Sequence, residues 1–298
     1  MELTEESLAR SHFSPENPTI IVAHGWNSNG RWRGYGASLA DDYLAEGDYN
    51  VFSVDWGDLE SWANYPHAAA ITRPVGEFAA ELGGANYFSM SCEGVKYKEF
   101  NYDNTTTLRI KLYSLAVVLL AGYGPDVLAN IHLVGHSLGA HVVGFMAKRV
   151  QALGLGKLPR LTGLDPAYPF FELAGPEGRV DKTDAELVQI VHTNSGWLWE
   201  GCLSFKVNTR SALFCVEPYL PQEPLGHVDF YPAGGSHQPG CTDLINVDSP
   251  LIDLLKVRLG TPAHTSPLTL VLQGGCSHAK SNSYFEESVH TVPGAGEW

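Results

Sequence analysis

The chain has 298 residues, of which 44% are hydrophobic, and this is enough to bury a sizeable core in one large domain. Its 33 acidic and 19 basic residues give a formal net charge of −14. Nucleic acids and anionic membranes are therefore excluded as electrostatic partners, because both attract basic surfaces. No apolar run reaches the length of about 20 residues that a transmembrane helix needs, so no membrane-spanning segment is expected.

Short apolar runs bounded by turn-forming residues predict five β-strands, at 18–23, 50–54, 130–134, 160–164 and 187–192. Helix-like stretches lie between them, from Tyr35 to Leu44, from Val75 to Leu82 and from Gly139 to Leu153. Strands that alternate with helices indicate parallel βαβ units, and continuously apolar strands fit a sheet covered on both faces. We therefore expect an α/β fold with a mostly parallel central sheet and helices on both faces. A mixed α+β fold is the alternative.

Two segments, 83–114 and 206–222, interrupt this alternation and are interpreted as insertions into a single domain that spans residues 1–298. They are either genuine surface loops or wrongly translated sequence. The five cysteines fit two disulfides and one free thiol, and no C-x-x-C motif indicates a zinc site. Within this scheme Cys215 of the second segment could pair with Cys202.

A nucleophile is indicated by the G-x-S-x-G pattern of Gly135-His136-Ser137-Leu138-Gly139. By itself this pattern also occurs around buried structural serines. Here it follows a predicted strand and opens a predicted helix, which is the setting of a nucleophile elbow. The elbow backbone is strained, and the flanking glycines remove side chains that would collide with the strand and the helix. Ser137 is therefore the expected nucleophile, at a helix N-terminus that favours negative charge.

An elbow serine needs a carboxylate and a histidine, which follow it in the chain order Ser, acid, His. Asp165 comes directly after the predicted strand 160–164, at the edge where open α/β sheets bind ligands. An aspartate that only caps the turn before Pro166 is an equally good interpretation of this position alone.

The histidines that follow this aspartate and qualify by order are His192, His227, His237, His264, His278 and His290. The first two lie within strand-like runs and are interpreted as structural. His237 and His264 lie in loops rich in Ser, Pro and Gly. His278 follows Cys276 in what reads as a loop that a disulfide could fix, and the residues alone favour it only slightly over His264.

Acyl transfer also needs two backbone N–H groups directed at the developing oxyanion. One comes from Leu138, the residue after the nucleophile, and the other from the loop after an early strand. His24-Gly25-Trp26 follows the first predicted strand, so the Trp26 N–H is the second expected donor. An ordinary glycine turn is the alternative.

Taken together, the motifs resemble those of the pancreatic lipase family. The shared pieces keep the family's order and cover most of the chain outside the two insertions: HGW at 24–26, VDW at 54–56, HLVGHSLGAHVVG at 132–144, GLDPAYPFF at 163–171, VHTN at 191–194, GHVDFYPAGG at 226–235, PGC at 239–241 and CSHAKS at 276–281. The resemblance implies an α/β-hydrolase fold and a triad of Ser137, Asp165 and His278. It also implies Trp26 and Leu138 as oxyanion donors.

The resemblance further implies that Cys241 and Cys276 pair at the base of a lid formed by the segment between them. Residues 251–257 would suit a short amphipathic lid helix that opens at a lipid interface. Trp197 and Trp199 belong to the other loop that borders the family's active site. Their rings could contact lipid, as amphipathic aromatics do at interfaces, or pack under the lid.

Members of this family can bind a structural calcium ion, and the stretch 179–184 resembles that region. Asp181 and Asp184 would be the matching carboxylates, since oxygen ligands suit calcium. The family's glutamate is offset here by one residue, so an exposed acidic turn is the preferred interpretation. No metal or organic cofactor is expected to take part in the chemistry.

The function that the resemblance implies is that of a secreted serine esterase acting on lipids at an interface. The rather long segment between Cys241 and Cys276 favours a triacylglycerol lipase, with a phospholipase A1 as the alternative. A lipid-binding relative of the yolk-protein type, or an inactive truncated form, is the alternative of another class. The family's first strands, a signal peptide and a C-terminal β-sandwich are not apparent, and the start of the chain is expected to be incomplete.

Overall fold

A six-stranded sheet forms the centre of the computed structural model, with the strand order β2-β1-β3-β4-β5-β8 and parallel pairing throughout. The structure describes residues 11–26, 28, 35–57, 59, 65–80, 124–168, 170–171, 173–194, 203–207, 210–214, 224–241 and 275–290. The strands are β1 (Thr19–Ala23), β2 (Asn50–Val54), β3 (Ile131–His136), β4 (Leu158–Leu164), β5 (Ala185–Val191) and β8 (Val228–Phe230). This is the α/β fold with a mostly parallel sheet that the alternation of strands and helices predicted.

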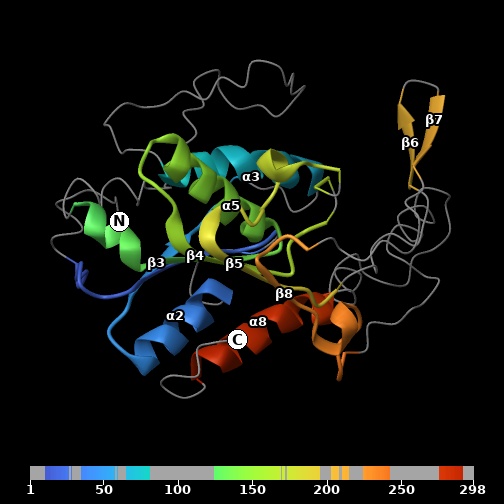
Figure 1. The fold of residues 1–298 in the computed structure, drawn as a ribbon. Helices are drawn as coiled ribbons and strands as arrows, with labels where there is room; N and C mark the ends of the chain where they lie inside the picture. Colours follow the sequence, from blue (N-terminus) through green and yellow to red (C-terminus); the bar gives the residue numbers. More distant parts are fainter. Residues whose placement is uncertain are drawn as a thin grey trace, which may run out of the picture.

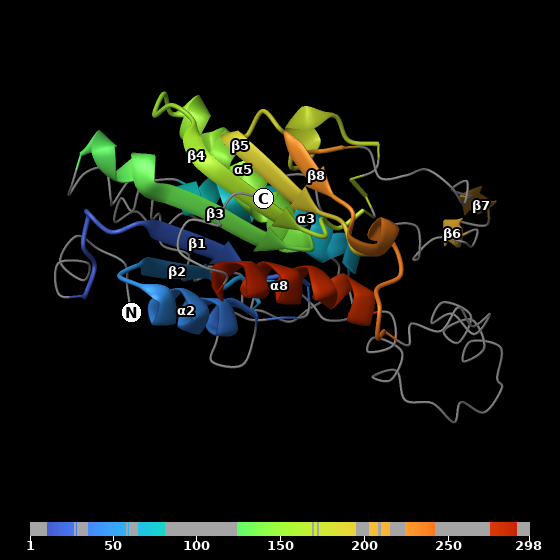
Figure 2. The ribbon, with the colours of Figure 1, turned by 60° about the horizontal axis from the view of Figure 1, so that its bottom comes forward.

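Two helical layers cover the sheet (Figure 1). Helices α3 (Tyr65–Ala80) and α5 (Leu138–Ala152) lie on one face, and α2 (Tyr35–Glu46) and α8 (Gly275–His290) lie on the other. Figure 2 shows α2 and α8 side by side below the strands. Because side chains alternate along a strand, Ile21 of β1 faces the α3/α5 layer while its neighbours Ile20 and Val22 pack with Leu39 and Phe285 on the other face.

Helix α3 begins at Tyr65, ten residues before the expected start at Val75. Pro74 lies inside this helix. A proline removes one backbone N–H donor and usually marks a helix boundary in a sequence, which is why the predicted start was wrong. Burial of the helix against α5 compensates for the lost hydrogen bond, since Val75, Gly76 and Ala79 are buried there.

Helix α8 is a second correction, because the residues around His278 were expected to form a loop. They form the first turn of a 16-residue helix instead. The strand β8 was not predicted either, since it has only three residues. The five predicted strands are all present, with ends that differ by a few residues.

The rest of the described chain consists of short elements. The antiparallel hairpin of β6 (Leu203–Val207) and β7 (Arg210–Phe214) includes part of the segment interpreted as the second insertion. Three 3-10 turns lie at Pro125–Asn130, Pro176–Gly178 and Pro232–Gly235. Segment 83–114, the predicted lid helix, both tryptophans at 197 and 199, and the Cys202–Cys215 pairing fall outside the described residues.

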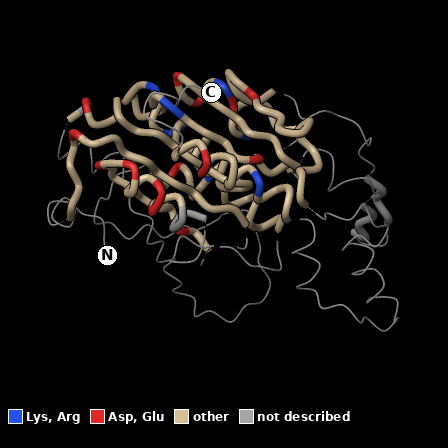
Figure 3. Tube along the Cα trace, turned by 90° about the horizontal axis from the view of Figure 1, so that it is seen from below, with Lys and Arg blue, Asp and Glu red and all other residues tan. Residues whose placement is uncertain are grey.

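Charged residues are interspersed along the described chain, where acidic and basic positions alternate with uncharged ones (Figure 3). This distribution fits the formal net charge of −14 of the whole chain. In the same part of the chain, no helix combines the length and the apolar character that crossing a bilayer requires.

Candidate active site

Ser137 joins β3 to α5 in a strained backbone conformation, with φ 58° and ψ −123°. Non-glycine residues rarely adopt positive φ, so the surrounding structure must hold this turn. The Ser137 N–H donates to the Leu164 carbonyl at 2.9 Å, and the Ser137 carbonyl accepts from Ala167 N at 3.2 Å. A side chain at Gly139 would collide with the Ala23 carbonyl oxygen. The turn therefore has the geometry that the nucleophile-elbow motif requires.

Asp165 follows β4 directly and lies at the same edge of the sheet as Ser137, because both parallel strands end there. Its side chain is only 3% exposed. One carboxylate oxygen, Oδ1, accepts hydrogen bonds from the N–H groups of Thr193 at 2.9 Å and Asn194 at 3.2 Å. These donors come from the end of β5 and fix the orientation of the carboxylate, which leaves Oδ2 for another partner.

His278 supplies that partner, since its Nδ1 lies 2.5 Å from Asp165 Oδ2. A carboxylate accepts hydrogen bonds, so Nδ1 carries the proton and Nε2 is left as the basic nitrogen. The histidine lies in the first turn of α8, two residues after Cys276, which forms a disulfide with Cys241 at a Cα–Cα distance of 5.6 Å. The predicted Cys241–Cys276 pair is thereby confirmed. Asp165 and His278, 113 residues apart in sequence, meet at one edge of the sheet.

Gln238 connects the two segments that carry this pair, and no sequence motif indicated its importance. Its side chain is fully buried, and its Nε2 donates to the carbonyls of Thr193 at 3.0 Å and Pro232 at 2.9 Å. Its backbone N–H donates to Ser277 Oγ at 3.0 Å, and its Oε1 accepts from Tyr284 Oη at 3.1 Å. One residue thus connects the loop after β5 with the first three turns of α8.

The loop after β1 lies against the nucleophile. A Cβ placed on Gly25 would come within 2.8 Å of Ser137 Cβ. The neighbouring His24 is buried, accepts from Trp56 N at its Nε2 and stacks on the Trp56 ring, with centroids 5.4 Å apart. This packing positions the backbone that leads to Trp26, one of the two expected oxyanion donors. The other, Leu138, is the first residue of α5, and N–H groups in the first helical turn have no partner within the helix.

His136, the residue before Ser137, contacts His278 and is a further residue that the sequence did not single out. Its Nε2 donates to the His278 carbonyl at 3.2 Å, and the two imidazole centroids lie 4.5 Å apart. Burial lowers the pKa of His136 to about 3, and the neighbouring His278 acts in the same direction. His136 therefore stays neutral near neutral pH and adds no charge beside the Asp165–His278 pair.

The other histidines that qualified by chain order lie elsewhere. His192 bonds Asp229 at 2.7 Å, and His227 Nδ1 accepts from Val188 N at 3.0 Å, in agreement with the structural role expected for both. His290 lies at the far end of α8, where it pairs with Asp42 and Glu46 of α2. His237 lies in the loop after β8, and His264 is outside the described residues.

The two carboxylates considered for calcium are not exposed, which corrects the preferred interpretation of this stretch. Asp181 is 7% and Asp184 0% exposed. Asp184 forms an ion pair with Lys148, and burial raises the pKa of Asp184 to about 6 although the lysine acts in the opposite direction. Among the described residues, His, Cys, Asp and Glu side chains form no group of three that could hold a metal ion. One of the carboxylate oxygens considered for calcium is thus already bonded to an ammonium group.

A parallel sheet of this order, with a strained serine after β3 and an Asp–His pair at the same edge, defines the α/β-hydrolase class. Within that class, the family model described as Lipase matches residues 114–295, and the chain belongs to this family.

Three relatives illustrate the sequence identity between this chain and known proteins. The chain is 30% identical to pancreatic lipase-related protein 3 of Homo sapiens over 96% of its own length and 47% of the relative's. It is 33% identical to lipoprotein lipase of Bos taurus over 95% of this chain and 46% of the relative. It is also 33% identical to phospholipase A1 of Vespula maculifrons over 75% of this chain and 58% of the relative. The chain thus spans about half the length of these proteins.

Proposed function

We propose that the chain is a serine carboxylic-ester hydrolase that acts on lipids at an interface, with Ser137 as nucleophile, Asp165 as acid and His278 as base. The observation that carries this proposal is the 2.5 Å contact between His278 Nδ1 and Asp165 Oδ2, at the sheet edge where the strained Ser137 turn also lies. A pair of this kind orients the imidazole and stabilises its charged form when it removes a proton from a serine.

The proposed mechanism is two-step acyl transfer. His278 Nε2 takes the Ser137 proton as Oγ attacks the ester carbonyl, and the N–H groups of Trp26 and Leu138 stabilise the tetrahedral oxyanion. Asp165 stabilises the imidazolium, which then protonates the leaving alcohol. Water, activated by the same histidine, hydrolyses the acyl-enzyme and restores the serine. Every proton transfer in this series of steps uses His278 of the chain, so the proposed chemistry requires no cofactor.

The preferred substrate class is triacylglycerol. Two of the relatives carry names of the lipase type, and the disulfide closes a segment with a sequence separation of 35 that would be long enough for a lid. Phospholipase A1 is the second candidate, and relatives of that name in Vespula maculifrons and Vespa crabro support it. A secreted location is part of the proposal, because disulfides such as Cys241–Cys276 form in oxidising compartments.

The test is release of fatty acid from emulsified triacylglycerol by the purified chain, compared with Ser137→Ala and with Ser53→Ala, an exposed serine on β2, as the matched control. We expect release by the wild type and the control, and a loss of about 10⁴-fold or more in Ser137→Ala. Release from phosphatidylcholine alone would replace the triacylglycerol assignment by phospholipase A1. No release from either substrate would overturn the proposal and favour a non-catalytic lipid-binding or inactive form.

A further inference from the structure

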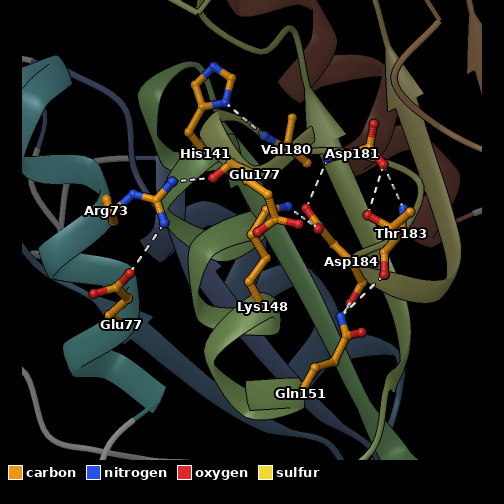
Figure 4. A network of polar contacts seen from close by, with 10 residues as sticks. All are labelled: Arg73, Glu77, His141, Lys148, Gln151, Glu177, Val180, Asp181, Thr183 and Asp184. Atoms are coloured by element: carbon orange, nitrogen blue, oxygen red, sulfur yellow. Dashed lines mark hydrogen bonds and ion pairs between the residues drawn. The ribbon is translucent and has the colours of Figure 1, made fainter. Parts of the chain in front are cut away.

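One face of α5 presents four residues at helical spacing, His141, Gly144, Lys148 and Gln151. Residues three and four apart lie on the same side of a helix, so these four form a stripe along its surface. The loop 176–184, which precedes β5, lies on this stripe (Figure 4). The loop leads directly into the strand whose far end supplies the N–H groups that hold the Asp165 carboxylate.

Backbone groups of the loop bond to three of the four stripe positions or pack against them. Val180 N donates to His141 Nδ1 at 3.1 Å, and Gln151 Nε2 donates to the Asp184 carbonyl at 2.9 Å. A Cβ on Gly144 would lie 3.0 Å from both Val180 Cα and Asp184 Oδ2. The loop therefore approaches the helix as closely as a glycine permits.

The fourth stripe position is Lys148, which places a positive charge beside the loop. Its ammonium pairs with Asp184 Oδ1, and both side chains are shielded from solvent, with 13% and 1% exposed. The other oxygen, Asp184 Oδ2, accepts from Asp181 N at 2.9 Å. Asp181 Oδ1 in turn accepts from the N–H and the hydroxyl of Thr183 at 2.9 and 2.8 Å. Three of the four carboxylate oxygens of Asp181 and Asp184 thus accept hydrogen bonds from donors of the chain.

A second cation holds the start of the loop from the neighbouring helix. Arg73 of α3 donates to the Glu177 carbonyl and also pairs with Glu77 at 3.3 Å (Figure 4). The side chain of Glu177 is exposed. The loop is therefore fixed at both ends by basic side chains from the α3/α5 layer.

We propose that the Lys148 ammonium group takes the place of a metal ion beside the buried Asp184 carboxylate, and that the loop 176–184 is therefore ordered without calcium. Calcium takes six to eight oxygen ligands, whereas the buried carboxylates of this loop already bond to an ammonium group and to N–H and O–H donors. A divalent ion beside the lysine ammonium would also be repelled by it. The stripe on α5 supplies a positive charge and hydrogen bonds in place of a bound metal and its coordination bonds.

The first test is thermal unfolding of the full chain, followed by circular dichroism, in excess calcium and in excess chelator. We expect the two melting temperatures to agree within about 1 °C, because a ligand that does not bind the folded state does not stabilise it. A melting temperature that falls on chelation and recovers with added calcium would overturn the proposal.

The second test compares Lys148→Met with Lys182→Met, an exposed lysine of the same loop. Removal of one partner from a buried ion pair leaves an uncompensated charge, so Lys148→Met should lower the melting temperature by about 5–10 °C. Lys182→Met should change it by about 1 °C or less. Equal melting temperatures for the two variants would contradict a cation role for Lys148.

If Lys148→Met does not fold, the double variant Lys148→Met/Asp184→Asn takes its place. It removes both charges of the pair, and replacement of a buried pair by neutral groups is much less disruptive than loss of one partner. We expect it to fold and to melt at the same temperature with calcium and with chelator. A double variant that needs calcium to fold would overturn the proposal.

Discussion

The two helical layers differ in how they contribute to the site. The α3/α5 layer packs on the sheet through the larger core cluster, and its helix α5 begins directly after Ser137, so the proposed nucleophile is positioned by the sheet and the core themselves. The α2/α8 layer has a smaller cluster, and it carries His278. That histidine depends on a disulfide and on the hydrogen bonds of Gln238 for its place. Changes to the second layer should therefore impair activity before they unfold the sheet.

The largest expected effect is on the Asp–His contact that joins the two layers. Asp165→Asn keeps the shape of the side chain and an oxygen for the Thr193 N–H, but it no longer favours the His278 tautomer with the proton on Nδ1. We expect kcat to fall about 10⁴-fold with a melting temperature close to that of the wild type. Ester hydrolysis and thermal unfolding measure the two quantities. Asp48→Asn, at an exposed position, is the control, and equal kcat for both variants would contradict the role of Asp165.

Removal of the disulfide should reduce activity less than loss of the Asp–His contact does. Replacement of Cys241 and Cys276 by serine should lower the free energy of unfolding by about 2–4 kcal/mol. On heating, the first turn of α8 should detach at a lower temperature than the one at which the sheet unfolds. Activity should therefore be lost on heating before the far-ultraviolet circular dichroism changes. Coincident loss of both signals at the wild-type temperature would argue against a tethering role.

Gln238→Leu removes the hydrogen bonds that link the loop after β5 to α8. We expect kcat to fall about 10-fold or more, with little change in KM, because a small displacement of His278 weakens proton transfer rather than binding. Gln189→Leu is the matched control, since this buried glutamine bonds Arg160 within the sheet. The control should lose stability and keep kcat. A Gln238→Leu variant with normal kcat would remove Gln238 from the positioning of the base.

The smallest effects concern acid stability, because two buried histidines besides His136 have lowered pKa values, His132 on β3 and His141 on α5. Burial lowers the pKa of His132, which contacts Phe285 of α8, well below its usual value, and lowers that of His141 to about 3. Since the unfolded chain binds more protons below about pH 6.5, stability should fall as the pH drops from there. Each histidine should contribute a slope of up to about 1.4 kcal/mol per pH unit.

Urea unfolding at several pH values measures this slope. His132→Gln and His141→Gln should each reduce it, whereas His12→Gln, at an exposed position, should leave it unchanged. A slope that none of the variants alters would assign the acid sensitivity to other groups.

Much of the α3/α5 side could be predicted because its signals are local. The strand β3 is buried along nearly its whole length and reads as an apolar run, and the glycines around Ser137 mark the turn that follows it. Position after a strand was also enough to bring Asp165 to the same edge. The start of α3 was missed because Pro74 reads as a helix boundary, and only burial against α5 shows otherwise.

The α2/α8 side was less predictable because its order comes from distant contacts. The helix α8 contains four serines and one asparagine, which favour caps and turns over helix interiors, so its sequence resembled a loop. Gln238 is an ordinary polar residue in sequence, and its importance appears only when its partners Thr193 and Tyr284, 45 and 46 residues away, are in place. Similarly, Asp181 and Asp184 looked like an exposed acidic turn because Lys148 lies 36 residues before Asp184.

The most direct test of the proposed triad is covalent labelling by an active-site phosphonate, with the modified residue located by mass spectrometry. The wild type should carry a single adduct on Ser137, and His278→Gln should label far more slowly because no base activates the serine. An unlabelled wild type, or an adduct on another serine, would contradict the assignment of Ser137, Asp165 and His278.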